Sequence, residues 1–123
     1  MMNTKILVVE DNVDNMRIMR DLLTSAGYEV IEAVNGQEGV TAAETQGPEL
    51  ILMDIQLPDF DGYEATRRIR ANTAVSAVPI IAVTSYALSG DDVKAFEAGC
   101  DAYVTKPFSP RELLAKIREY LQQ

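Results

Sequence analysis

The sequence predicts a doubly wound α/β domain, in which helices cover both faces of a parallel β-sheet. Short apolar runs alternate five times with longer stretches of helical periodicity. These runs are nearly continuous, as is typical of strands buried on both faces. The chain has 123 residues, the usual size of one domain. We therefore expect a single domain over residues 1–123.

The five expected strands are the apolar runs, and each is followed by polar, glycine or proline residues. In chain order they span Lys5–Val9, Glu29–Ala33, Leu50–Asp54, Pro79–Ser85 and Asp101–Thr105. Parallel strands are joined by right-handed helical crossovers, so their carboxyl ends meet at one edge of the sheet. In doubly wound sheets the ligand site lies at this edge, where the strand order reverses.

The first two helices are predicted from an apolar stripe and from capping residues. The stripe of the first helix ends before Gly27, and it consists of Met19, Leu22, Leu23 and Ala26. In the second helix, Asn35 and Glu38 have the spacing of N-cap and N3 residues. This helix should end by Gly47 and Pro48, because glycine ends helices and proline cannot continue them.

The last three helices are predicted in the same way. The third is expected over about residues 63–70, and Ser89 should cap a fourth that stops at Gly99. Ser109 to Glu112 form a capping box with Pro110 at N1. The apolar face of the fifth helix consists of Leu113, Leu114, Ile117 and Leu121.

Composition and charge exclude several classes of function. A net charge of -8 argues against nucleic-acid binding, because phosphate backbones are bound by clustered Lys and Arg. No apolar run approaches the ~20 residues that span a bilayer, and no signal-peptide pattern is present, so we expect a cytoplasmic protein without a membrane segment. The chain has no histidine, which excludes histidine nucleophile pairs, histidine metal ligands and phosphohistidine.

Charged and hydroxyl residues stand where four of the strands end. Glu10 and Asp11 follow the first strand, Asp54 ends the third, Thr84 stands near the end of the fourth, and Lys106 follows the fifth. Each residue alone has an ordinary interpretation, as a helix cap, a strand residue or a solvated lysine. Independent roles of this kind do not account for their convergence on one edge, so we expect a functional site.

Crowded carboxylates at this edge would need cations to stay ionised. Lys106 supplies one positive charge, and Mg²⁺ would supply the rest, since it takes carboxylate oxygens and leaves room for a phosphate oxygen. The backbone carbonyl of Gln56 is placed to be a further ligand, and the Thr84 hydroxyl to donate to a phosphoryl oxygen. A carboxylate is a competent nucleophile toward phosphorus, so Asp54 is expected to become an aspartyl phosphate.

Four segments, taken together, point to one family. They are LVVEDN (7–12), ILMDIQLPDFDGYE (51–64), IIAVTSYA (80–87) and AYVTKPF (102–108). In this combination the chain resembles the response-regulator receiver domain, the CheY-like superfamily of two-component signalling. The resemblance implies a flavodoxin-like (βα)5 three-layer sandwich with a five-stranded parallel sheet in the order 2-1-3-4-5. It also implies a phosphoacceptor that catalyses its own phosphorylation and dephosphorylation, rather than an enzyme with another substrate.

The resemblance gives roles to the residues at the edge of the sheet. It implies that Asp54 is the phosphoacceptor and that Glu10 and Asp11 are the acidic pair that binds Mg²⁺. The third protein ligand would be the backbone carbonyl of Gln56. Lys106 would pair with the acceptor and with its phosphate. Because the first acid is Glu10, where Asp is also common, we expect its metal contact to run through water.

The resemblance also implies a conformational switch. Thr84 would be the switch hydroxyl and Tyr103 the switch aromatic residue, and the bond between Lys106 and Pro107 would be cis. Movement of Thr84 toward the phosphate would let Tyr103 swing inward. This change would alter the face formed by the fourth helix, fifth strand and fifth helix, near residues 86–88, where a downstream protein target would bind.

Protein partners are expected on a second surface, beside the site. A sensor histidine kinase or histidine phosphotransferase would dock on a patch made by Asn12, Asn15, Ile18 and Phe108, together with Pro107. The chain itself is expected to be a monomer or a weak dimer, without nucleic acid. The segments EDNVDN (10–15) and MDIQLP (53–58) also resemble DivK-type single-domain regulators and receivers fused to hybrid kinases. Nothing follows the last helix, so we expect no output domain.

Three alternatives stay open. One is a receiver domain excised from a hybrid histidine kinase. A phosphatase of the haloacid dehalogenase type would need a second acid two positions after Asp54, where this chain has Gln56. An FMN binder would need a hydroxyl- and glycine-rich phosphate loop after the first strand, where this chain has Glu10, Asp11 and Asn12.

Overall fold

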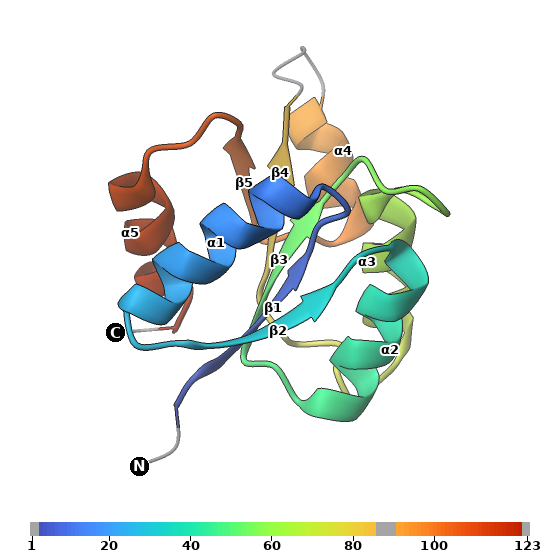
Figure 1. The fold of residues 1–123 in the computed structure, drawn as a ribbon. Helices are drawn as coiled ribbons and strands as arrows, with labels where there is room; N and C mark the ends of the chain where they lie inside the picture. Colours follow the sequence, from blue (N-terminus) through green and yellow to red (C-terminus); the bar gives the residue numbers. More distant parts are fainter. Residues whose placement is uncertain (1–2, 86–90, 122–123) are drawn as a thin grey trace.

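The computed structural model describes residues 3–85 and 91–121, in which five strands and five helices alternate (Figure 1). The strands are β1 (Lys5–Val9), β2 (Glu29–Ala33), β3 (Leu50–Asp54), β4 (Ile80–Thr84) and β5 (Ala102–Thr105). The helices are α1 (Val13–Ser25), α2 (Gly36–Gln46), α3 (Gly62–Ala71), α4 (Asp91–Ala98) and α5 (Pro110–Leu121). None of these described helices has both the length and the apolar character needed to cross a bilayer.

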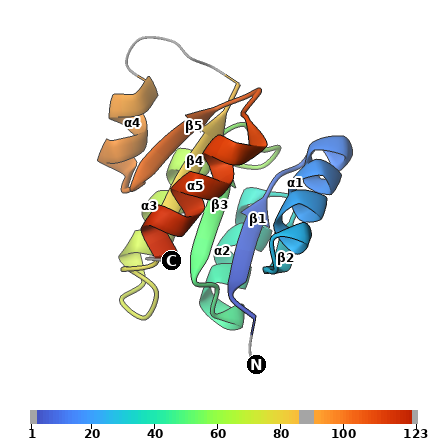
Figure 2. The same ribbon diagram turned by 90° about the vertical axis from the view of Figure 1, so that its left-hand side faces the viewer.

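The sheet is parallel throughout and has the strand order β2-β1-β3-β4-β5, which confirms the predicted fold class. Helices α1 and α5 cover one face, and α2, α3 and α4 cover the other (Figures 1 and 2). The chain leaves β1 toward one edge to form β2 and then returns across β1 to form β3. The strand order therefore reverses between β1 and β3, which makes their carboxyl ends the expected ligand site.

Successive residues of the central strands enter opposite cores, because side chains of a strand alternate between its faces. Leu7, Val9, Ile51 and Met53 pack under α2, α3 and α4, whereas Ile6, Val8, Leu50 and Leu52 pack under α1 and α5. All eight side chains are buried. Burial on both faces explains why the sequence of each central strand is continuously apolar, and it holds the strand ends rigidly in place.

The predicted boundaries of β1, β2 and β3 agree with the structure. Strand β4 excludes Pro79 and Ser85, β5 excludes Asp101, and α3 extends one residue beyond the predicted range of 63–70 at each end. At Pro79 and Asp101 the flanking backbone still bonds to the sheet, since the Ile51 N–H donates to Pro79 O at 2.9 Å and the Asp101 N–H donates to Ile80 O at 2.8 Å. The predicted cap at Ser89 lies outside the described residues.

The predicted caps of α2 and α5 are present. Asn35 Oδ1 accepts from the Glu38 N–H at 2.8 Å, and Ser109 Oγ accepts from the Glu112 N–H at 3.4 Å. Helix α2 ends at Gly47, whose φ of 61° lies in the left-handed region that favours glycine. Local sequence signals therefore determine where both helices begin and where α2 ends.

Candidate functional site

Three carboxylates meet where β1 and β3 end. One oxygen from each of Glu10, Asp11 and Asp54 lies within 4.8 Å of the other two. Glu10 is 1% exposed and Asp54 5%, whereas Asp11 is exposed. Buried carboxylates are costly unless they are paired or coordinate a metal. The cluster therefore requires positive charge close to it.

Lys106 supplies one positive charge to this cluster from the segment after β5. Its Nζ donates to Glu10 Oε1 at 2.6 Å and to Asp54 Oδ2 at 3.4 Å. The backbone N–H of Lys106 donates to Thr84 O at 2.7 Å, which holds the residue against the end of β4. The peptide bond between Lys106 and Pro107 is cis. One lysine thus bridges the two buried carboxylates, with the shorter contact to Glu10.

Backbone N–H groups orient both buried acids. The N–H of Gln56 donates to Asp54 Oδ1 at 3.2 Å, and the N–H of Asn12 donates to Glu10 Oε2 at 3.2 Å. Each donor lies two residues after its acid, in the loop that leaves the strand. The loops thereby hold the carboxylates in fixed positions at the carboxyl edge of the sheet.

The electrostatics of the cluster favour a cation. The pKa of Asp54 is raised to about 7. Burial raises it most, the hydrogen bond and the negative charge of Glu10 raise it as well, and Lys106 and the Gln56 N–H offset only part of this increase. Three acids face one lysine, so negative charge is left uncompensated. Carboxylate oxygens are the ligands that Mg²⁺ prefers. The chemistry of this donor set therefore fits Mg²⁺.

The residues of the expected switch lie on one face of two adjacent strands. Thr84 is buried at the end of β4, and Ala82, two residues before it, pairs with Tyr103 on β5. Side chains two residues apart in a strand share a face, so Thr84 and Tyr103 belong to the same face. Tyr103 is half-buried and packs against the core under α2, α3 and α4.

A groove of about 530 Å³ lies beside the carboxylates, between α1 and the segment after β5. Its lining consists of Asn15, Ile18, Met19, Ser85, Lys106, Pro107, Phe108 and Pro110. The structure thus brings Asn15, Ile18 and Phe108 of the expected docking patch together, with Ile18 56% exposed. Asn12 does not line this groove; its Oδ1 caps α1 by accepting from the Asn15 N–H at 2.9 Å.

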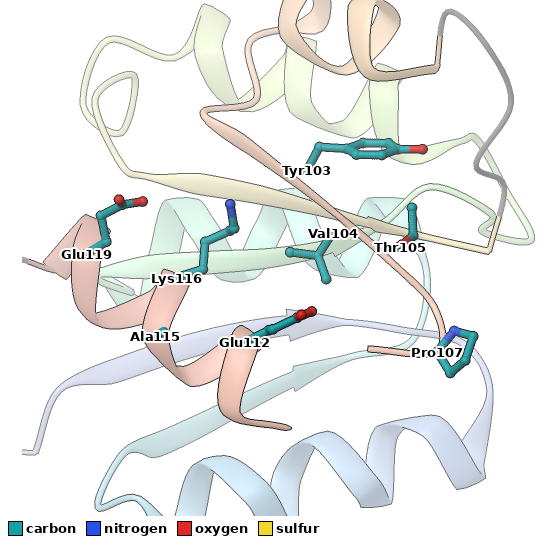
Figure 3. Close-up of a pocket in the computed structure, with 8 residues that line it drawn as sticks. All are labelled: Tyr103, Val104, Thr105, Pro107, Glu112, Ala115, Lys116 and Glu119. Carbon is teal, nitrogen blue, oxygen red and sulfur yellow. The ribbon is translucent and has the colours of Figure 1, made fainter. Parts of the chain in front are cut away.

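A second groove of about 530 Å³ lies between β5 and α5, on the face expected to bind a downstream target. Its lining consists of Tyr103, Val104, Thr105, Pro107, Glu112, Ala115, Lys116 and Glu119. Lys116 points from α5 toward β5 in Figure 3. On α4, Val93 and Phe96 are both 52% exposed. Residues 86–88, also expected on this face, lie outside the described residues.

Two contacts near the site were not predicted from the sequence. One is the short contact between Lys106 and Glu10, which requires the ends of β1 and β5 to be placed in space. The other is made by Asp59, whose carboxylate accepts from two N–H groups of α2. The sequence around Asp59 predicts a loop, and no local pattern indicates that Asp59 contacts Gly36, 23 residues away.

Comparison with known proteins decides the family. Residues 6–118 match the family model of the response regulator receiver domain. The chain belongs to this family. It is 41% identical over 120 residues to the polar-differentiation response regulator DivK of Brucella anthropi, covering 98% of each protein.

Solved structures of receiver domains have the same fold. The receiver domain of sensor histidine kinase PA1611 from Pseudomonas aeruginosa, which holds a magnesium ion in its active site cleft, is 41% identical with a TM-score of 0.92. That comparison covers 99% of this chain and 100% of the other. Chemotaxis protein CheY4 of Vibrio cholerae is 25% identical with a TM-score of 0.91, over 97% of this chain and 99% of its own.

Membership of the receiver family makes this chain a phosphoacceptor of two-component signalling rather than a conventional enzyme. Receiver domains are phosphorylated on an aspartate in a reaction that depends on Mg²⁺, and the acidic cluster supplies suitable ligands. A histidine kinase is the corresponding class of partner. The phosphatase and FMN-binding alternatives are thereby set aside.

We predict that Asp54 makes the metal-free protein less stable as the pH rises from 3.8 to about 7. The folded state binds the Asp54 proton more tightly than the unfolded chain, whose pKa is near 3.8. The resulting stabilisation is full below that value and is lost as the pH rises to about 7. Since one pKa unit corresponds to about 1.4 kcal/mol, the expected loss is on the order of 2–4 kcal/mol.

Urea unfolding at pH 5 and pH 8 measures this effect. Asp54→Asn should reduce the difference between the free energies of unfolding at the two pH values. Added Mg²⁺ should raise the free energy of unfolding of the wild type at pH 8. Asp14→Asn, which removes an exposed acid from α1, should keep the wild-type difference. Equal pH dependence in the wild type and Asp54→Asn would contradict the prediction.

Proposed function

We propose that Asp54 accepts a phosphoryl group from the phosphohistidine of a sensor histidine kinase or a histidine phosphotransferase. The observation that carries this proposal is the cluster of Glu10, Asp11 and Asp54 around one edge, with Lys106 bridging two of its members. In the reaction an Asp54 oxygen attacks phosphorus, the phosphorus–nitrogen bond breaks, and the imidazole leaves. The buried strand end holds this nucleophile in a fixed orientation.

The same proposal gives Glu10, Asp11, Asp54 and the backbone carbonyl of Gln56 as the residues that would hold Mg²⁺. When bound, Mg²⁺ neutralises the carboxylates and the charge on the phosphoryl oxygens. Lys106 stands 3.4 Å from Asp54 Oδ2, where its ammonium group would bind an oxygen of the phosphorylated aspartate. Ionised Asp54 is the reactive form, so the cations that lower its pKa also prepare it to attack.

We propose that coupled movements of Thr84 and Tyr103 transmit phosphorylation to a downstream protein target. Phosphate on Asp54 adds negative charge and acceptor oxygens, to which the Thr84 hydroxyl would donate. Movement of Thr84 would change the space available to Tyr103, which lies on the same face of the sheet and also lines the groove between β5 and α5. A protein target would bind this face. Its preference for the phosphorylated form would equal the difference in its binding free energy between the two states.

We propose that the chain acts as a stand-alone regulator or relay in the cytoplasm, where ATP supplies histidine kinases. Its coverage of 98% of the DivK relative supports this organisation. The likeness to a receiver domain of a sensor histidine kinase keeps a kinase-attached receiver as the second candidate. The net charge of -8 favours protein partners over nucleic acid.

Phosphorylation at Asp54 is tested with acetyl phosphate, Mg²⁺ and intact-mass measurement. The wild type should gain one phosphoryl group, and Asp54→Asn, which keeps the shape of the side chain but not the nucleophile, should gain none. Asp11→Asn should need more Mg²⁺ for the same rate. Retained labelling of Asp54→Asn would show that another residue is the acceptor.

Docking of the donor is tested by Ile18→Asp. A charge in the groove beside the site should slow transfer from a phosphorylated histidine kinase by at least about tenfold, while labelling by acetyl phosphate stays unchanged. Val93→Asp is the matched control, since Val93 has similar exposure on α4 but lies away from this groove. Equal rates of kinase transfer in the two variants would exclude this groove as the docking surface.

The switch is tested by NMR with and without beryllofluoride, which stands in for the phosphoryl group. Chemical-shift changes should extend from Asp54 through Thr84 and Tyr103 to α5. In Tyr103→Ala, beryllofluoride should still bind, but the changes in α5 should be smaller. Changes confined to the residues around Asp54 in the wild type would rule out this route to output.

A further inference from the structure

The loop between β3 and α3, residues 55–61, carries Gln56 and is anchored at its base. The Gly62 N–H donates to Ile55 O at 2.8 Å, which closes the loop where it leaves the strand. A Cβ atom on Gly62 would collide with the carbonyl oxygen of Asp54, so the absence of a side chain lets the loop fold back against the strand end. The base of the loop is therefore in direct contact with the acceptor residue.

The tip of the same loop is tied to α2 by Asp59. Asp59 Oδ1 accepts from the Gly36 N–H at 2.7 Å, and Oδ2 accepts from the Gln37 N–H at 2.9 Å. These donors are in the first turn of α2, where helix N–H groups lack partners within the helix and negative charge is favoured. Asp59 is exposed, and the slight desolvation that raises its pKa is outweighed by the N–H groups of Gln37 and Gly36, which hold that pKa below its ordinary value.

Phe60 adds an apolar contact to this tether. A Cβ atom on Gly36 would lie 2.6 Å from Phe60 Cε1, so the ring packs directly against the backbone where α2 begins. On α3, the Arg68 guanidinium lies 3.9 Å from the centroid of the ring. Asp59 and Phe60 together fasten the loop to α2 through charge and through packing.

We propose that Asp59 is a positioning residue of the metal site, which acts by holding the loop that carries the Gln56 carbonyl. This inference rests on the proposed function, because it assumes that the carbonyl is a metal ligand. Gln56 lies between the anchored base at Ile55 and the anchored tip at Asp59. A ligand on a loop lacks the support of a strand or helix, and contacts that orient metal ligands typically change metal affinity roughly 10–100-fold.

Helix capping alone does not explain the position of Asp59. The N-cap of α2 is Asn35, which already accepts from the Glu38 N–H at 2.8 Å. Asp59 comes from a segment 23 residues away in sequence and joins the start of α2 to the end of β3. Loss of a residue that only caps α2 should leave Mg²⁺ binding unchanged. Loss of a residue that holds the loop with Gln56 should weaken it.

The experiment compares Asp59→Ala with Asn35→Ala. Both variants remove acceptors of N–H groups in the first turn of α2, so both should lower the melting temperature by similar amounts. Only Asp59→Ala detaches the loop, and it should weaken Mg²⁺ binding roughly tenfold in calorimetric titration with MgCl₂. Its phosphorylation by acetyl phosphate should approach the wild-type rate when Mg²⁺ is saturating. Asp59→Asn, which keeps one acceptor oxygen, should lie between Asp59→Ala and the wild type.

The outcomes separate this inference from the proposed function. Wild-type Mg²⁺ affinity in Asp59→Ala would overturn the positioning role, and so would equal weakening in Asn35→Ala, since that would reflect the stability of α2 alone. Gly36→Ala gives a second test, because its methyl group would displace Phe60 and should also weaken Mg²⁺ binding. Absence of Mg²⁺ binding in the wild type, or unchanged binding in Asp11→Asn, would instead overturn the proposed metal site.

Discussion

The functional site depends on the cost of burying carboxylates at the end of a parallel sheet. Glu10 and Asp54 are almost fully removed from water, and Lys106 donates to both of them. One ammonium group offsets only part of the negative charge, and the pKa of Asp54 is raised, first by burial and then by the neighbouring Glu10 carboxylate. This excess of negative charge destabilises the metal-free site. It also favours binding of a divalent cation and, through that cation, of a phosphoryl group.

The fold supplies this arrangement because apolar strands run through the middle of the protein. Residues of β1 and β3 pack into separate cores on the two faces of the sheet, so neither strand can shift without disturbing both cores. Charged residues placed at the ends of such strands are held as firmly as the strands themselves. Ligands on loops lack this support, which is why the contacts of Asp59 and Phe60 with α2 are significant for the Gln56 carbonyl.

The segment that follows β5 connects the site with both candidate binding surfaces. Pro107 lines the groove beside α1 and also the groove beside α5. Tyr103 lies in the second groove, Phe108 in the first, and Lys106 contacts the carboxylates. A change in the interactions of Lys106 can therefore affect both the groove beside α1 and the groove beside α5, because one short stretch of backbone connects them.

The sequence by itself determined the order of the elements, the boundaries of β1 to β3, and the residues at the carboxyl edge of the sheet. These features follow from local signals, since apolar runs, capping residues and strand-end charges are separated by only a few positions. Tertiary structure decided which of these residues touch. The sequence favours Asp54 as the partner of Lys106, whereas the fold gives Lys106 a closer contact with Glu10, at the far end of the chain. It also decided that Asp59 binds α2 and that Asn12, which caps α1 by a local contact with Asn15, lies outside the docking groove. The partner of Asp59 and the lining of the groove depend on distances between segments that the chain brings together only when it folds.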